Sequence, residues 1–168
     1  QGHEGAADLS EMTDTDYLRL AFQAAAEWSG DNSTQNGAIL VPQTGTIISG
    51  VNDFPIGVLP RLDRPAKYQR IEHAERAVVY AASRAGVSTL GSRLYCCWFA
   101  CSDCARAIVM SGIREVVGHA LPRQETPQRW AAEVAAGEQI LREGGVSMRW
   151  LTGNLGCEIL FDGGRLKC

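Results

Sequence analysis

The chain has 168 residues, of which 45% are hydrophobic and 21% are charged, and its formal net charge is −3 at pH 7. This composition is ordinary for a globular protein, and a chain of this length can bury a core without disulfide or other staples. The negative charge disfavours a nucleic-acid partner, and no apolar run approaches the ~20 residues that a membrane span requires. Residues 1–7 have neither a basic leader nor an apolar core. We therefore expect no signal peptide there and a disordered segment over residues 1–12.

Hydrophobic periodicity predicts an alternation of helices and strands along the chain. In chain order we expect a helix at about 14–28, strands at 37–41, 47–51 and 94–98, with helices following residues 75 and 104, a strand at 114–120, a helix at 128–143, and strands at 146–151 and 158–166. A turn at 42–45 joins the first two strands. Residues 52–70 form a long loop, and loops of this length in a compact domain are usually functional.

This order predicts a three-layer α-β-α sandwich around a central mixed sheet of about five strands. The helix at 128–143 connects the strands at 114–120 and 146–151, and a crossover helix of this kind makes the strands it joins parallel. Its core candidates are Trp130, Val134, Ile140 and Leu141. We expect a single domain over residues 13–168 that ends in a short C-terminal extension.

Two short motifs carry metal-binding side chains, His73-Ala74-Glu75 and Cys101-Ser102-Asp103-Cys104. Their His and two Cys supply three zinc ligands, whereas a structural zinc site normally has four protein ligands and a catalytic site keeps one position open for water. Each motif is preceded by strand-like sequence and followed by helix-like sequence. The ligands are therefore expected at two facing helix N-termini, which favour the thiolate form of both cysteines.

Glu75 is a carboxylate that the metal does not need as a ligand. It lies two residues after His73, and on the first turn of a helix that spacing can aim both side chains into one pocket. The combination of H-x-E with C-x-x-C is the signature of zinc deaminases, in which the Glu shuttles protons. The sequence therefore predicts a hydrolytic deaminase with one Zn²⁺ per chain.

The spacing of the six cysteines does not indicate a disulfide framework. Four of the six crowd into residues 96–104, which indicates a metal site in a cytoplasmic protein. Cys96 and Cys97 alternate along a strand and are expected on opposite faces. Cys157 and Cys168 are predicted to be free thiols, with their pairing left open. His119 falls on a strand, where a core or edge histidine is the more common role.

With these motifs, the chain resembles the cytidine deaminase superfamily, specifically its deoxycytidylate deaminase-like branch, from about Thr15 to Leu151. Residues 31–38 are similar to the family's S-T-Q-x-G-A segment, and residues 50–55 are similar to its G-x-N-x-F-P segment. The parallel last strand separates this branch from the small cytidine deaminases, whose corresponding strands are antiparallel. The resemblance implies a homo-oligomer, because deaminases of this superfamily usually cover the pocket with neighbouring subunits.

The resemblance also implies roles for individual residues. His73, Cys101 and Cys104 would bind zinc, Glu75 would be the general acid and base, and Asn52 would contact the sugar or the base. The chain departs from the family at two positions. Ala100 replaces the usual Pro before the first metal-binding Cys, and Ala77 replaces the usual Asn two residues after the catalytic Glu, which removes a polar contact from the pocket floor.

The implied substrate is a free pyrimidine nucleotide, with dCMP favoured. Backbone groups around Ala74 and Ala100 would orient the base, while Tyr68 and Trp98 would either stack on it or pack in the fold. A 5′-phosphate needs cationic partners, and the long loop offers four that equally suit a solvated surface or a subunit contact: Arg61, Arg64, Lys67 and Arg70.

Two other functions stay open. One is deamination of another amino-heterocycle, such as guanine, a pterin-like ring or another nucleobase or nucleoside. The other is a catalytically silent zinc-binding protein, against which the intact Glu75 argues.

Overall fold

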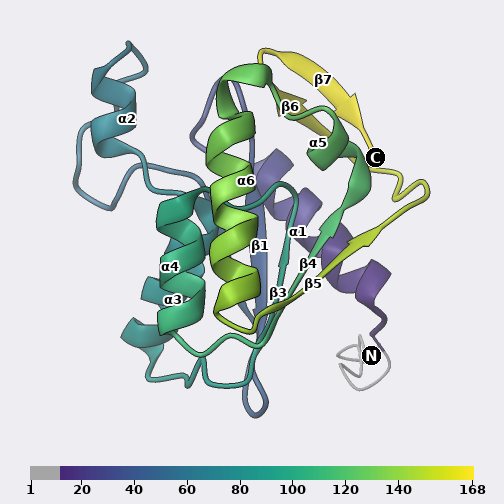
Figure 1. The fold of residues 1–168 in the computed structure, drawn as a ribbon. Coiled ribbons are helices and arrows are strands. Elements are labelled where there is room, and N and C mark those ends of the chain that lie inside the picture. The colour runs from purple at the N-terminus through teal and green to yellow at the C-terminus, as the bar shows by residue number, and fades with distance from the viewer. Residues whose placement is uncertain (1–11) are drawn as a thin grey trace, which may run out of the picture.

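The computed structural model describes residues 12–168, so the expectation for the N-terminal segment lies almost entirely outside the described residues. Figure 1 shows the arrangement of the elements. The helices are α1 (Asp14–Trp28), α2 (Ala66–Arg70), α3 (Ala74–Ala85), α4 (Ser102–Met110), α5 (Ala120–Gln124) and α6 (Gln128–Glu143). The strands are β1 (Gly37–Val41), β2 (Ile48–Val51), β3 (Arg93–Cys96), β4 (Glu115–His119), β5 (Ser147–Leu151), β6 (Glu158–Phe161) and β7 (Gly164–Lys167).

Five of these strands form one mixed sheet in the order β2-β1-β3-β4-β5. Strand β1 pairs antiparallel with β2 and with β3, whereas β3-β4 and β4-β5 are parallel pairs. The parallel pairs follow from the crossovers through α4 and through α5 and α6, since a helical crossover returns the chain in the same direction. The predicted mixed sheet with parallel last strands is confirmed.

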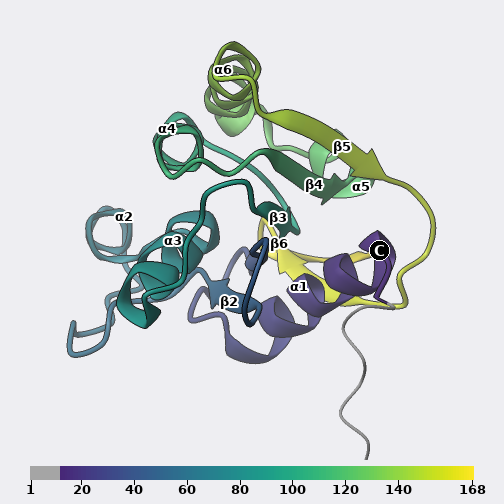
Figure 2. The ribbon, with the colours of Figure 1, turned by 90° about the horizontal axis from the view of Figure 1, so that it is seen from below.

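The two faces of the sheet bury two separate apolar clusters. Along β3, Leu94 and Cys96 face the cluster built by α3, α4 and α6, whereas Tyr95 and the following Cys97 face the cluster built by α1. This alternation is the period of two that strand geometry imposes. The expected opposite placement of Cys96 and Cys97 is confirmed. Figure 2 shows the resulting layers, with α1 and the β6-β7 hairpin on one side of the sheet and α3, α4 and α6 on the other.

The structure differs from the sequence-based expectations at several elements. Strand β3 ends at Cys96, and the long loop contains the short helix α2. The expected strand at 158–166 is a β6-β7 hairpin instead, because Asp162 and Gly163 both have positive φ, 51° and 79°. An Asp-Gly pair in this conformation is a strong signal for a two-residue hairpin turn. The expectation of a single domain over 13–168 stays a prediction.

The placement of single side chains agrees with most of the sequence-based expectations. His119 is buried, and its ring accepts a hydrogen bond from the Leu121 N–H at 3.2 Å, in agreement with a core role. All six cysteines, including Cys157 and Cys168, are free thiols. Trp130, expected in the core, is only partly buried. None of the described helices combines the length and apolar character that crossing a bilayer demands.

Asp14 links the start of α1 to two strands of the sheet. Its carboxylate accepts a 2.6 Å hydrogen bond from the buried Tyr95 hydroxyl and pairs with Arg149 at 2.8 Å and with Arg93 at 3.4 Å. The hydrogen bond from Arg149, aided by the one from Tyr95, holds the pKa of Asp14 below its ordinary value against the opposing effect of burial. The ionised carboxylate is therefore part of the folded state.

We predict that Asp14→Asn lowers the free energy of unfolding at pH 7 by about 1–2 kcal/mol, because hydrogen bonds to a partly buried charge are lost. A carboxyl whose pKa is lowered by folding stabilises the protein above its unfolded pKa, and that contribution disappears as pH falls through the folded pKa. The difference from the parent should thus shrink from pH 7 to pH 3 in urea unfolding. Glu27→Gln, an exposed change on the same helix, is the control; an equal loss there would contradict the assignment.

Candidate functional site

The two motifs meet at the N-termini of adjacent helices. His73 is the N-cap residue of α3, Cys101 is the N-cap residue of α4, and Cys104 lies in the first turn of α4. Neither N-cap side chain caps its own helix. The backbone N–H of His73 donates to Glu72 at 2.8 Å. The imidazole and both thiols are turned toward one another, as the sequence predicted.

The donor atoms have the spacing that zinc requires. The Nδ1 atom of His73 lies 3.5 Å from Cys101 Sγ and 3.4 Å from Cys104 Sγ, and all three donors lie within 4.8 Å of one another. A nitrogen and a sulfur bound to the same tetrahedral zinc are about 3.6 Å apart. Among the described residues this is the one cluster of at least three His, Cys, Asp or Glu side chains close enough to share a metal ion. The site fits zinc with three protein ligands.

Cys101 and Cys104 affect the acidity of each other's thiol. The hydrogen bond between them lowers the pKa of Cys101 to about 4, with further help from His73, and raises the pKa of Cys104. The contact with Cys101 in turn raises the pKa of His73, against the effect of burial. Zinc binds thiolates and neutral imidazole, so metal binding would release the protons that these side chains carry without the metal.

Glu75 lies in the first turn of α3 and is 2% exposed. Burial is the main cause that raises its pKa to about 7. Its Oε2 atom accepts from Asn36 Nδ2 at 3.5 Å, and Asn36 is held by the Trp98 backbone, to whose carbonyl it donates at 2.8 Å and from whose N–H it accepts at 3.1 Å. Asn36 is a functional candidate that sequence reasoning missed. The available signal was a polar side chain directly before a buried strand.

The cluster opens into a cleft of about 790 Å³, counted to its open mouth. Its walls include the apolar side chains of Ile71, Phe99 and Val134, together with the Trp98 ring. Most predicted site residues line it: Asn52, Arg64, Lys67, Tyr68, His73, Glu75, Ala100 and Cys101. Ala74 is fully buried behind the cleft. Arg61 and Arg70 lie outside the cleft, where Arg61 pairs with Asp63 at 3.2 Å.

Asn52 and Lys67 are both engaged with the protein itself. The Asn52 carboxamide accepts from Asn36 N at 2.7 Å and donates to the Thr34 carbonyl at 2.7 Å. Lys67 is 4% exposed, and its Nζ atom lies 2.6 Å from the Asp31 carboxylate. The expectation that these two residues contact a substrate stays a prediction, while their observed contacts hold the turn at 31–36 and the helix α2 in place.

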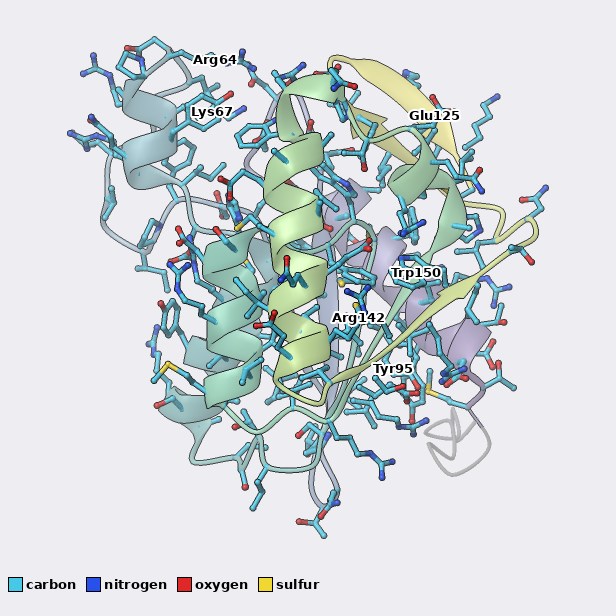
Figure 3. The ribbon with its side chains drawn as sticks, viewed as in Figure 1. Arg64, Lys67, Tyr95, Glu125, Arg142 and Trp150 are labelled. Atoms are coloured by element: carbon cyan, nitrogen blue, oxygen red, sulfur yellow. The ribbon has the colours of Figure 1, made fainter. Side chains whose placement is uncertain are left out.

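Arg64 and Tyr68 form the α2 side of the cleft mouth. The Arg64 guanidinium lies over the Tyr68 ring at 5.3 Å, and the Tyr68 ring meets Trp130 edge-on with centroids 6.0 Å apart. We call α2 and the loop before it the α2 arm. Figure 3 shows Arg64 and Lys67 on the side of the α2 arm that faces α6. The four cations of the loop therefore do not form one patch, because Arg61 and Arg70 do not line the cleft.

Helix α6 supplies lining residues that the sequence did not reveal: Arg129, Trp130, Glu133 and Val134. Trp130 shares the spacing of the core residues, so periodicity alone places it in the core. Helix α6 can approach the backbone at Ala100 and Cys101 because its residue 137 is a glycine. A Cβ atom there would lie 1.9 Å from the Ala100 carbonyl oxygen. A close approach of this kind is seen only once the tertiary structure is known.

We predict that the protein binds one zinc per chain and that His73→Ala and Cys104→Ala abolish stoichiometric binding in elemental analysis. A ligand present at 100 times its Kd stabilises the folded state by about 2.7 kcal/mol. Both variants, and the parent treated with a chelator, should therefore unfold at a lower temperature than the parent. Cys157→Ala, which removes a thiol outside the cluster, should keep the metal. Equal zinc loss from that control would contradict this ligand set.

Comparisons with known proteins agree with this site. A family model described as the cytidine and deoxycytidylate deaminase zinc-binding region matches residues 11–120. The chain is 29% identical over 143 residues to a protein of Aliivibrio fischeri described as an uncharacterized deaminase in the luxG 3′ region, a match that covers 80% of this chain and 93% of that protein. It is 33% identical over 113 residues to deoxycytidylate deaminase of Mus musculus, with 60% of this chain and 61% of the mouse protein covered.

The chain thus spans less than two thirds of the mouse protein's length. A solved structure of dCMP deaminase from the cyanophage S-TIM5, in complex with dCMP and dUMP, matches with a TM-score of 0.67 at 24% identity and covers 80% of this chain and 93% of that chain. This likeness shows the fold. Because the family model spans most of the chain and contains the entire metal cluster, the chain belongs to the cytidine and deoxycytidylate deaminase family of zinc-dependent hydrolytic deaminases.

Proposed function

We propose that the protein deaminates a free pyrimidine nucleotide, converting dCMP and water to dUMP and ammonia. The observation that carries the proposal is the buried Glu75 carboxyl beside the His73, Cys101 and Cys104 donors, at the base of a cleft whose mouth bears Arg64 and Arg129. The similarity to mouse deoxycytidylate deaminase supports dCMP as the substrate.

Glu75 would perform the proton transfers of the reaction. It takes a proton from the attacking water and passes it to the ring nitrogen beside the attacked carbon. It then takes the remaining proton of the newly added hydroxyl group and gives it to the amine, which leaves as ammonia while the ring carbon becomes a carbonyl. When bound by its three ligands, zinc supplies the Lewis acidity that activates water. The contact from Asn36 orients the Glu75 carboxyl, because Asn36 is itself fixed by two hydrogen bonds to the Trp98 backbone.

The rest of the cleft would bind and orient the nucleotide. Trp98 and Phe99 offer apolar walls for the base. The backbone of Ala100, and that of Ala74 between the cleft-lining His73 and Glu75, would meet the polar edge of the base. Asn52 and Lys67 act through the turn at 31–36 that they hold. The mouth receives the 5′-phosphate, since arginine binds planar arrays of phosphate oxygens with two parallel hydrogen bonds.

A homo-oligomer and a cytoplasmic location stay proposals as well. Exposed apolar side chains support association between copies. The loop before α2 exposes Ile56 at 92% and Leu59 at 75%, and the end of α4 exposes Met110 at 88%.

We predict that Glu75→Gln keeps zinc and fold but lowers the turnover of dCMP by roughly 10²–10⁴-fold, the usual contribution of a general acid–base group. Ammonia release measures turnover, and elemental analysis and thermal unfolding confirm that the metal and the fold persist. The control Glu27→Gln removes an exposed carboxylate from α1 and should be as active as the parent. A Glu75→Gln variant that works near the parent rate would exclude Glu75 as the proton carrier.

We predict that dCMP is turned over with a higher kcat/KM than deoxycytidine and that Arg64→Ala lowers the value for dCMP by about tenfold, as expected for one charge-assisted hydrogen bond. The nucleoside value should hardly change, and added salt should reduce the preference. The control Arg61→Ala removes a cation of the same loop that lies outside the cleft. If deoxycytidine, guanine or a pterin-like ring proved as good a substrate as dCMP, the nucleotide proposal would fail.

A further inference from the structure

The tip of the C-terminal hairpin reaches the rim of the cleft, although it lies outside the residues that the family model matches. The Gly163 N–H donates to the Ser33 carbonyl at 2.9 Å, and the Asp162 N–H donates to Thr34 Oγ1 at 3.0 Å. Ser33 and Thr34 both line the cleft. The hairpin turn is therefore fastened to the cleft by its backbone, independently of its side chains.

The Asp162 side chain projects from this turn to Arg129 of the cleft. Its two carboxylate oxygens accept from the two terminal nitrogens of the guanidinium, the second contact measuring 3.3 Å. The hydrogen bond from Arg129 lowers the pKa of Asp162, and the charges of Arg129 and Arg64 add to this effect. Asp162 has a φ of 51° and is the one non-glycine residue with positive φ among residues 12–168. This is the usual conformation of an Asp-Gly hairpin turn, and it directs the Asp162 carboxylate to Arg129.

The other cations near the cleft mouth show why the Asp162–Arg129 contact affects the binding of an anion. Lys67 is buried against Asp31 and has no exposed ammonium to offer an incoming anion. Arg129 is already neutralised by Asp162, which leaves Arg64 as the cation at the mouth that has no ion pair with a carboxylate among residues 12–168. A phosphate group makes the same two-fold contact with arginine that a carboxylate makes. The Asp162 carboxylate thus occupies a position that suits a substrate phosphate.

We propose that Asp162 is an internal competitor for the anion position on Arg129, and that the phosphate of a nucleotide binds by displacing it. This inference rests on the proposed function, because it assigns the phosphate-binding group of the same cleft. The exchange is easy, because the two side chains are 46% and 39% exposed and ion pairs that exposed are weak. Asp162 consequently sets how strongly the cleft prefers phosphorylated over non-phosphorylated ligands.

The opposite role for Asp162 is to hold Arg129 in a productive position. The two roles predict opposite effects for Asp162→Asn, which removes the charge and is tolerated at positive φ. If Asp162 competes, the loss of its charge strengthens phosphate binding. If Asp162 only positions Arg129, its loss weakens phosphate binding.

The test is calorimetric binding of dUMP, deoxyuridine and inorganic phosphate to the zinc-loaded full chain. Asp162→Asn should tighten the binding of dUMP and phosphate by about threefold to fivefold, the size of an exposed ion pair. Arg129→Ala should weaken both by about tenfold or more. Deoxyuridine, which has no phosphate, should bind all variants equally.

The matched controls are Glu158→Gln and Arg165→Ala. Glu158 and Arg165 form the other Arg–carboxylate pair of the hairpin, with a separation of 2.5 Å, and neither lines the cleft. Both controls should bind all three ligands as the parent does. Unchanged or weaker dUMP binding by Asp162→Asn, or an equal effect on deoxyuridine, would overturn the proposal. Failure of the proposed function looks different, because the parent would then bind dUMP and phosphate without deaminating dCMP.

Discussion

The functional site depends on one geometric constraint, the convergence of an imidazole and two thiols within a few ångströms of each other. The residues come from chain segments that lie far apart in sequence, so the backbone must bring two helix starts together. The helices α3 and α4 achieve this by packing on the same face of the sheet, and the chain leaves strand β3 directly before the start of α4. Because both N-cap side chains turn away from their own helices, the starts of α3 and α4 present ligands in place of ordinary caps. The buried Glu75 then lies beside the donors as a direct consequence of its place on the first turn of α3.

A second layer of polar contacts keeps the cleft in shape. Asp31 accepts from the backbone of Ser33 at 2.8 Å and of Thr34 at 3.1 Å, and it also binds the buried ammonium of Lys67. Asn52 fastens the same turn to the end of β2. Buried polar groups must be satisfied within the protein, so these contacts specify one conformation of the turn. Through Lys67 they also anchor the α2 arm, which carries Arg64 and Tyr68 to the mouth of the cleft.

The metal cluster and one part of the cleft mouth come from different parts of the chain. The metal ligands and Glu75 lie within residues 11–120, which the family model matches. Beyond them, α6 contributes Arg129 and Trp130, and the β6-β7 hairpin contributes Asp162, which pairs with Arg129. In a division of this kind the mouth of the cleft can change while the metal cluster does not.

The sequence by itself determined the chemistry and the layer order. Ligand type and spacing at His73, Cys101 and Cys104 are local properties of two motifs, and strand and helix periods are local properties of the chain, so both can be recognised without coordinates. The tertiary structure decided what lines the cleft. Trp130 follows the core period yet lies at the mouth, Lys67 is neutralised by a residue 36 positions away, and Arg129 meets Asp162 from a separate hairpin. No local pattern encodes these contacts, because each depends on how distant segments pack and on which charges they bring face to face.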